Sequence, residues 1–448
     1  MQDLYIKGHI RHEKENYTFV YENGRLTLIA IKNSYDLFGE NRKIDWFKGQ
    51  TLDGFIIIFY INSIIYFKDG SCSCSPRCIL IFRKKELDFD NAIINSLTFS
   101  GGIINRFYSN SNLISTSKGK IIFKNTDEPV SEEKVDLNGT ETTFQFSVMD
   151  PELINDGSIK FGDFNSLLRI KYSSEKNCES VIKDLVSVIN FFEFCANRKD
   201  ITVDKIFLEV LNEDSKYEKI VQIMVPHMVG QKNKTNIFDY KVLKNNINGI
   251  FNFLENCNYI FGIIPKNNKD YDTISDKDYC AAFSCFESIQ HYICDIKEDE
   301  ESTKEEIALN EIKNEIVPVL DEMAEKYKGI NKLKRDFIKR FTNIIYTSNY
   351  KLEKGIISEI EKRPFIVDSL RYKIKNAIKN TEISASVSKA VGDRDILTHN
   401  NLVRLDIISI GIYRIILMLN YAMILEYIGV SKDKYAIKMQ QLSLEYIV

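Results

Sequence analysis

Residues 392–428 read GDRDILTHNNLVRLDIISIGIYRIILMLNYAMILEYI, and this stretch decides how the C-terminal half of the chain is interpreted. Its second part, residues 402–428, is rich in Ile and Leu but is interrupted by polar side chains. These are Arg404, Asp406, Arg414, Asn420 and Glu426. A charge near the middle of a membrane span is costly, and no uninterrupted apolar run reaches about 18 residues. We therefore expect a helix buried in a core or at a dimer interface. A membrane-associated effector is the alternative, and solubility without detergent separates the two.

Upstream of this stretch, from about residue 238, nearly all of the chain follows helical spacing. Candidate helices cover roughly residues 240–260, 278–295, 303–328, 333–348, 351–378, 383–391 and 402–428. Either Ser275 or Asp276 can cap the second of these, and Ser302 with Glu305 fits a capping box at the third. The C-terminal region is therefore predicted to be an all-helical bundle, with the segment between the last two helices left as a polar break.

The first 170 or so residues indicate strands rather than helices. Turn signals separate apolar and β-branched runs at Asn23-Gly24, Asp69-Gly70, Asn138-Gly139 and Asp156-Gly157. The run FIIIFYINSIIYF at 55–67 is too continuous for one half-exposed strand, so it predicts two strands or a bent one buried on both faces. A helix is expected near 176–197, and strands follow at 201–210 and 220–225 before Pro226.

These patterns predict an α+β multidomain protein. Residues 1–235 form a β-rich N-terminal sensor or regulatory region, with the helix near 176–197 inside it. Residues 236–448 form an all-α helical domain. The 448 residues are 44% hydrophobic and 27% charged, which is enough for a sizeable core. The formal net charge of -3 means that any nucleic-acid-binding surface must be local.

The N-terminal sequence MQDLYIKGHIRHEKENYTF is polar and has no apolar segment of the signal-peptide type. Nine cysteines are scattered without disulfide-scaffold spacing, so we expect a cytoplasmic protein. Cys72, Cys74 and Cys78 in SCSCSPRC lack a CxxC pair and a nearby histidine, so no metal site is predicted there. No cofactor is expected either.

Arg394, Asp395 and His399 form the constellation that suits catalysis. Histidine titrates near neutral pH, so it can take a proton from a ribose 2′-hydroxyl or give one to the leaving 5′-oxygen. Arginine is a permanent cation that stabilises charge on phosphoryl oxygens, and an adjacent Asp can orient it through a fork-like pair. The same residues also fit a polar cluster at a helix junction. His291, four residues after Glu287, is interpreted as part of a helix-surface pair with that carboxylate.

Residues 331–380 contain 13 Lys/Arg and 5 Asp/Glu, a local net charge of +8. The densest part supplies the candidate RNA-binding residues, which are Lys332, Lys334, Arg335, Lys339 and Arg340. Phe337 and Phe341 alternate with them and are expected to face the core. Such a basic helix can bind phosphates, and a solvated helix face is the alternative reading.

The stretch RDILTH, followed by a long hydrophobic helix at the end of a helical domain, resembles the HEPN family. Arg394, Asp395 and His399 match its Arg, polar and His positions, although Asn or His is also typical where Asp395 stands. A β-rich region before this domain is similar to ApeA-type HEPN proteins of bacterial antiphage defence. The resemblance covers about 170–210 residues for the helical part and is organisational for the rest.

The resemblance implies a metal-independent endoribonuclease that cleaves RNA by 2′-hydroxyl attack, leaves a cyclic phosphate and acts in antiphage defence by abortive infection. Two such domains pair in the family, so it implies a homodimer in which Arg394 and His399 are catalytic within a composite site and Asp395 supports them. RNA, either tRNA or mRNA, would be the substrate, and a phage-derived trigger is implied. The alternative is a non-catalytic HEPN-like module that dimerises and binds RNA or protein.

Overall fold

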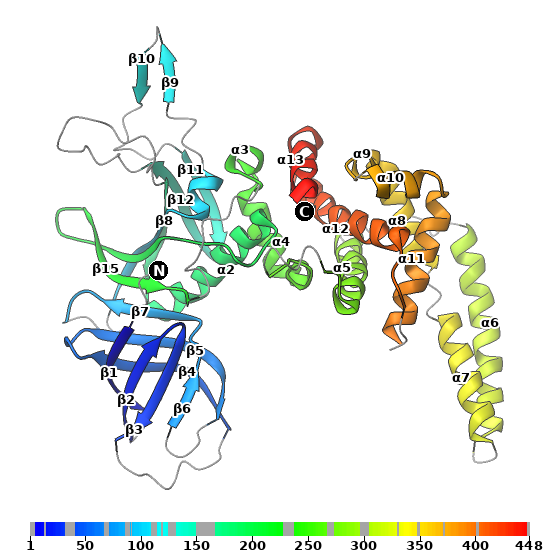
Figure 1. The fold of residues 1–448 in the computed structure, drawn as a ribbon, viewed down its shortest axis with the longest axis horizontal. Coiled ribbons are helices and arrows are strands. Elements are labelled where there is room, and N and C mark those ends of the chain that lie inside the picture. The colour runs from blue at the N-terminus through cyan, green and yellow to red at the C-terminus, as the bar shows by residue number, and fades with distance from the viewer. Residues whose placement is uncertain are drawn as a thin grey trace.

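The computed structural model places a sheet-rich half beside a helical half (Figure 1). The residues it describes are 5–12, 15–31, 41–66, 71–85, 90, 92–108, 114–117, 120–123, 131–148, 166–226, 237–266, 273–295, 304–328, 331–346, 350–370, 372–399 and 403–445. Across these ranges the expected α+β order is confirmed, because an antiparallel sheet comes first and a helical region follows.

Thirteen strands make one antiparallel sheet in the described part of the chain. They are β1 (Tyr5–His12), β2 (Glu15–Glu22), β3 (Arg25–Ala30), β4 (Asn41–Thr51), β5 (Ile56–Tyr66), β6 (Ser71–Cys74), β7 (Cys78–Phe82), β8 (Ile94–Ser100), β11 (Ser131–Leu137), β12 (Thr140–Val148), β13 (Ser166–Lys176), β14 (Lys205–Leu211) and β15 (Tyr217–Met224). Their spatial order is β11-β12-β13-β8-β14-β15-β7-β5-β4-β1-β2-β3-β6. A separate hairpin pairs β9 (Ile114–Ser117) with β10 (Lys120–Phe123).

Two of the expected hairpin turns are confirmed. Asn23-Gly24 joins β2 to β3 and Asn138-Gly139 joins β11 to β12, and all four residues have positive φ. That backbone matches the twist of the flanking strands, and Asn and Gly tolerate it best. The turns expected at Asp69-Gly70 and Asp156-Gly157 lie outside the described residues.

Within the run at 55–67, residues Ile56–Tyr66 form the single bent strand β5, and Phe67 lies outside the described residues. Asn62 has φ 46°, and the β4–β5 register shifts nearby, between Ile44 and Trp46. The first half of β5 is largely buried on both faces, as expected. The expectation is wrong for the second half, because only one face is covered there: Ile65 is 4% exposed in the smaller core, whereas Ile64 is 70% exposed.

The hydrophobic residues form two cores. The smaller one lies among β1 to β7, at one end of the sheet. The larger one begins under the rest of the sheet, which is covered by α1 (Ile103–Phe107) and α2 (Cys178–Ala196). It continues without a break into the helical region, so the composition change near residue 235 does not separate two independent cores.

The helical region contains more elements than the sequence predicted. They are α3 (Tyr240–Leu243), α4 (Ile247–Asn256), the 3-10 helix η4 (Asn258–Gly262), α5 (Asp276–Asp295), α6 (Lys304–Lys326), α7 (Lys332–Tyr346), α8 (Tyr350–Lys362), α9 (Pro364–Asp368), α10 (Tyr372–Lys379), α11 (Ile383–Thr398), α12 (Ile407–Tyr427) and α13 (Lys432–Glu445). The segment expected as one helix over 351–378 is three, because Pro364 begins a new helix after Arg363. The last helix, α13, was not predicted.

Ser275 is the residue that caps α5. Its hydroxyl oxygen lies 3.2 Å from the backbone nitrogen of Asp278, and the Asp278 carboxylate accepts hydrogen bonds from the hydroxyl and the backbone N–H of Ser275. This reciprocal pair is a capping box. The capping box expected at Ser302 lies outside the described residues.

The hydrophobic helix α12 lies at the centre of the helical region (Figure 1). Among the described residues it is the one helix long and apolar enough to cross a membrane, and 72% of its most apolar 18-residue window is buried inside the protein. Its Tyr421 ring stacks on Phe194 of α2, and its hydroxyl reaches Asn197 at 3.0 Å. Helix α12 therefore joins the helical region to the helix that covers the sheet.

Candidate functional site

The candidate pair lies on the last turns of α11, which is longer than expected. The polar segment that was predicted to break the helical pattern is part of the helix, which runs to Thr398 and is capped by His399. Inside it, the Thr398 hydroxyl donates to the carbonyl of Arg394 at 2.8 Å, and the backbone N–H of His399 donates to the carbonyl of Asp395. The first bond satisfies the Thr398 hydroxyl within the helix, and the second belongs to its backbone.

Arg394 is held between two carboxylates. Its Nη1 lies 3.1 Å from Oδ1 of Asp395, and its Nη2 lies 3.0 Å from Oε2 of Glu287 on α5. The side chain is 17% exposed, and its buried Nε has no hydrogen-bond partner among the described residues. Asp395 was expected to orient Arg394 through a fork-like pair of hydrogen bonds. The ion pair between them joins Nη1 to Oδ1. Glu287 supplies the second contact and was not predicted as part of the site.

His399 is exposed at the C-terminal end of α11. Within the described ranges, its imidazole makes no hydrogen bond. The five-residue spacing from Arg394 corresponds to a rise of about 7.5 Å along a helix. A permanent cation and an exposed imidazole therefore stand about one and a half turns apart on the same helix end.

A partly exposed polar cluster, in which Asp393 and Ser409 are buried, fixes α11 against the start of α12. Lys389 lies 3.0 Å from the carboxylate of Asp393, and the Ser409 hydroxyl donates to the same carboxylate at 2.5 Å. Asp406 caps α12 by accepting hydrogen bonds from the backbone of Ile408 and Ser409. Partial burial opposes its ionisation, but these bonds and the charge of Lys389 lower the pKa of Asp406.

Helix α5 holds α11 from the other side. The Tyr279 hydroxyl donates to the carbonyl of Ala390 at 3.0 Å, and burial together with the nearby Asp393 charge raises the pKa of Tyr279. Cys280 lies 3.8 Å from the hydroxyl of Thr398. The end of α11 is therefore supported by α5 and α12, which is how a rigid scaffold positions reactive side chains.

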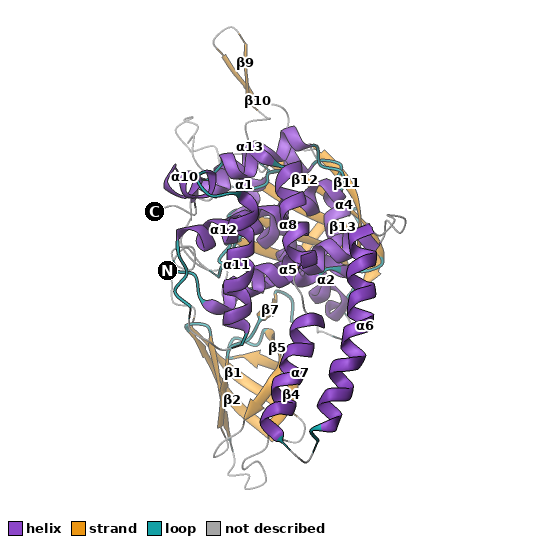
Figure 2. Ribbon diagram, turned by 90° about the vertical axis from the view of Figure 1, so that its right-hand side faces the viewer, coloured by secondary structure: helices purple, strands orange, loops and turns teal. Residues whose placement is uncertain are grey.

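The candidate RNA-binding residues lie on α7, which packs against α6 as a helical hairpin (Figure 2). Lys332, Lys334 and Lys339 are exposed, Arg335 is half-buried, and the side chain of Arg340 lies outside the described residues. The Lys334 ammonium stands 5.2 Å over the ring of Tyr327.

The expectation that Phe337 faces the core is wrong, because its side chain is 72% exposed. Thr342, five residues further along α7, is by contrast only 5% exposed. The side chain of Phe341, expected to face the core as well, lies outside the described residues.

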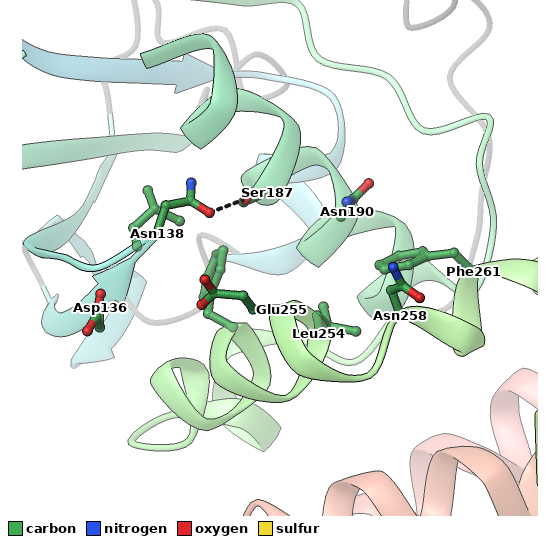
Figure 3. Close-up of a pocket in the computed structure, with 10 residues that line it drawn as sticks. Asp136, Asn138, Ser187, Asn190, Leu254, Glu255, Asn258 and Phe261 are labelled. Atoms are coloured by element: carbon green, nitrogen blue, oxygen red, sulfur yellow. Dashed lines mark hydrogen bonds between the residues drawn. The ribbon is translucent and has the colours of Figure 1, made fainter. Parts of the chain in front are cut away.

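A separate pocket of about 190 Å³ lies between the β11–β12 turn, α2, α4 and η4 (Figure 3). Polar side chains line it around an apolar floor that includes Phe251 and Phe261. Asn138 is held in place at its edge, because the Ser187 hydroxyl donates to its Oδ1 at 3.2 Å and its Nδ2 donates to Asp184 at 2.7 Å. None of its lining residues belongs to α11, so the pocket is distinct from the candidate pair.

The three clustered cysteines sit in β6 and β7. Burial raises the pKa of Cys72 and Cys78 to about 12 and that of Cys74 to about 11. Since the thiolate is the form that binds metals and reacts with electrophiles, burial here opposes both.

Comparison of the chain with protein-family models, curated proteins and solved structures finds no match.

Proposed function

We propose that this chain is a metal-independent endoribonuclease of HEPN type that acts in bacterial antiphage defence. The observation that carries the proposal is the placement of Arg394 and His399 at the supported, solvent-facing end of α11. Cleavage of RNA through its own 2′-hydroxyl needs a group that transfers protons near neutral pH and a cation for the phosphoryl charge, and histidine and arginine can supply these two functions. Family resemblance in the RDILTH stretch supports the same assignment.

In the proposed reaction His399 takes the proton of the ribose 2′-hydroxyl. The 2′-oxygen then attacks the adjacent phosphorus and the bond to the 5′-oxygen breaks. That oxygen takes a proton from water, and His399 releases its own proton to the solvent. Arg394 stabilises the charge that builds on the phosphoryl oxygens. The products are a 2′,3′-cyclic phosphate end and a 5′-hydroxyl end, and DNA is spared because it lacks the nucleophile.

The proposed enzyme is a cytoplasmic homodimer with a composite site, in which each chain contributes Arg394 and His399 and Asp395 steadies the arginine. Lys332, Lys334, Arg335, Lys339 and Arg340 on α7 would contact phosphates of the RNA substrate, whether tRNA or mRNA. The β-rich region would sense a phage-derived trigger or restrain the nuclease.

A specific observation favours a second candidate, a non-catalytic HEPN-like module that binds RNA or protein. Both Nη groups of Arg394 already face carboxylates, so its charge is largely compensated in this conformation. In the binding module these ion pairs are permanent and structural. In the enzyme they must exchange for RNA phosphate during each turnover.

The test is incubation of the purified chain with total RNA in the presence of a chelator, with mapping of the cut ends. We expect cyclic-phosphate ends, and we expect His399→Ala and Arg394→Ala each to lower cleavage by at least about 100-fold, the usual contribution of such groups. His9→Ala, an exposed histidine on β1, is the matched control and should cleave normally. Full cleavage by both site variants would end the proposal and leave the binding module.

A further inference from the structure

Helix α6 carries an apolar stripe that no other part of the described chain covers. Its members are Ile312, Ile316, Val319 and Met323, which are 51%, 41%, 56% and 44% exposed. The spacing of four, three and four residues places all of them on one face of the helix. Surface apolar residues are common singly, but a continuous row of large ones marks an interaction site.

The stripe is not the face that holds the hairpin together. Val317 and Ala324 are 4% and 1% exposed, and they lie on the side of α6 that meets α7. At roughly 100° per residue, the stripe is turned by about 120°, a third of a circle, from that seam. Figure 2 shows the α6–α7 hairpin extending beyond the helices around α5, α8 and α11, so the stripe is accessible to a partner.

Charge on the hairpin is divided between its two helices. Helix α6 has seven acidic and three basic residues, a net charge of -4, whereas α7 has five basic and one acidic residue, a net charge of +4. On α6 the exposed residues Glu311, Glu315 and Glu322 follow the edge of the stripe that points away from α7. An acidic edge and a basic edge therefore flank the same apolar row.

We propose that this stripe is the contact between two copies of the chain, packed with their α6 helices parallel about a two-fold axis that runs along the hairpin. That axis turns the acidic edge of each α6 toward the basic α7 of its partner, so Glu322 faces the end of the partner's hairpin that carries Lys334. An antiparallel pairing would instead bring acidic edge against acidic edge, and like charges across an interface are unfavourable. The charge pattern thus favours a second copy of this chain as the partner of the stripe, with its α6 parallel to the first.

This inference does not depend on RNA cleavage, because it concerns assembly alone. Its closed two-fold symmetry uses the same patch on both chains, as most homodimers do. Of the two expectations for the helix at 402–428, a core or a dimer interface, the burial of α12 inside the chain supports the core, and the exposed stripe of α6 is left as the contact surface.

The mass of the full chain in solution, measured by sedimentation velocity over a dilution series, tests the contact. We expect a dimer for the wild type and at least about a ten-fold weaker association for Val319→Glu, with the circular dichroism spectrum unchanged. Ile437→Glu is the matched control, because Ile437 is an equally apolar residue that is 62% exposed on α13. A monomeric wild type, or equal dimerisation of Val319→Glu, would overturn the proposal.

Cysteine cross-linking tests the direction. In the parallel arrangement each stripe residue meets its own copy, so Ile312→Cys and Met323→Cys should each form disulfide-linked dimers on a non-reducing gel. Cross-linking only when the two variants are mixed would show an antiparallel pairing and overturn the two-fold proposed here. The third outcome is that Val319→Glu dimerises like the wild type and neither cysteine variant forms a disulfide-linked dimer. The dimer interface would then lie on another surface, or the stripe would bind a different protein, and either result contradicts the proposal.

Discussion

At the scale of residues, the environment of Arg394 is the feature most relevant to function. Its Nη groups face Asp395 and Glu287 at 3.1 and 3.0 Å, and a phosphate needs those same donors. Asp395 was predictable because it is the next residue in the chain. Glu287 was not, since it lies 107 positions earlier and reaches Arg394 only because α5 packs across α11. Contacts between helices depend on packing that local spacing does not encode.

If RNA competes with Glu287 for Arg394, removing the charge of Glu287 should strengthen RNA binding. We expect Glu287→Gln to lower the KM for RNA about two- to five-fold, because partly exposed ion pairs contribute up to about 1 kcal/mol. Glu361→Gln on α8, an exposed carboxylate without an ion pair in the described part of the chain, is the control. Initial rates of RNA cleavage over a range of RNA concentrations give KM and kcat for both variants and test this prediction. A fall in kcat with KM unchanged would instead show that Glu287 positions the arginine.

At the scale of elements, amphipathic spacing predicted where the helices lie better than where they end. The segment 392–401 was interpreted as a break because it is polar, yet α11 continues into it as far as Thr398. The reason is tertiary, since Asp393 finds Ser409 of α12 and Lys389 as partners. Phe337 shows the opposite error: its position on α7 resembles a core position, but the described structure places no element over it.

Helix α2 carries a buried acid that makes a pH-dependent prediction. Burial raises the pKa of Glu193 from its ordinary 4.5 to about 7, although the charge of Lys199 lowers it. Because the pKa is higher in the folded protein, ionisation of Glu193 lowers the free energy of unfolding. This loss is complete above about pH 7, where Glu193 is ionised in both states, and it shrinks as the pH falls toward 4.5. We expect Glu193→Gln to stabilise the protein by at most about 3 kcal/mol at pH 8 and by much less at pH 5.

Thermal unfolding at the two pH values measures this difference. Glu175→Gln is the control, because Glu175 is exposed at the end of β13 and should change the Tm little at either pH. A stabilisation of the same size at both pH values would show that the gain does not arise from ionisation of Glu193.

At the scale of the whole molecule, sequence patterns predicted the order of sheet and helices but not how strongly they are joined. A boundary near residue 235 was drawn where strand-like runs give way to helical ones. The larger core nevertheless runs from the sheet into α12 and α13. Strand order was equally inaccessible, because β8 lies between β13 and β14, strands from much later in the chain. Pairings over such distances follow from complementary surfaces rather than from local pattern.

The continuous core predicts that sheet and helices unfold together. Trp46, the single tryptophan, packs against Tyr60 in the sheet with tilted rings 4.4 Å apart and contacts the larger core, so its fluorescence reports on that half. Ellipticity at 222 nm reports mainly on the helices. In Tyr421→Phe, the α12 hydroxyl that reaches the Asn197 side chain is lost, at a cost of about 1–2 kcal/mol. We expect both probes to shift to lower denaturant by the same amount.

Tyr259→Phe, at a tyrosine that is 58% exposed on η4, removes a hydroxyl without removing that link and should leave both midpoints in place. Coincident transitions are the behaviour of one cooperative unit. If Tyr421→Phe moved the ellipticity midpoint and left the Trp46 fluorescence midpoint unchanged, the sheet and the helices would be separate folding units. In that case the hydrophobic contact through α12 would join two domains that unfold independently. The proposed trigger, if it binds the sheet, would then have to affect α11 through other contacts.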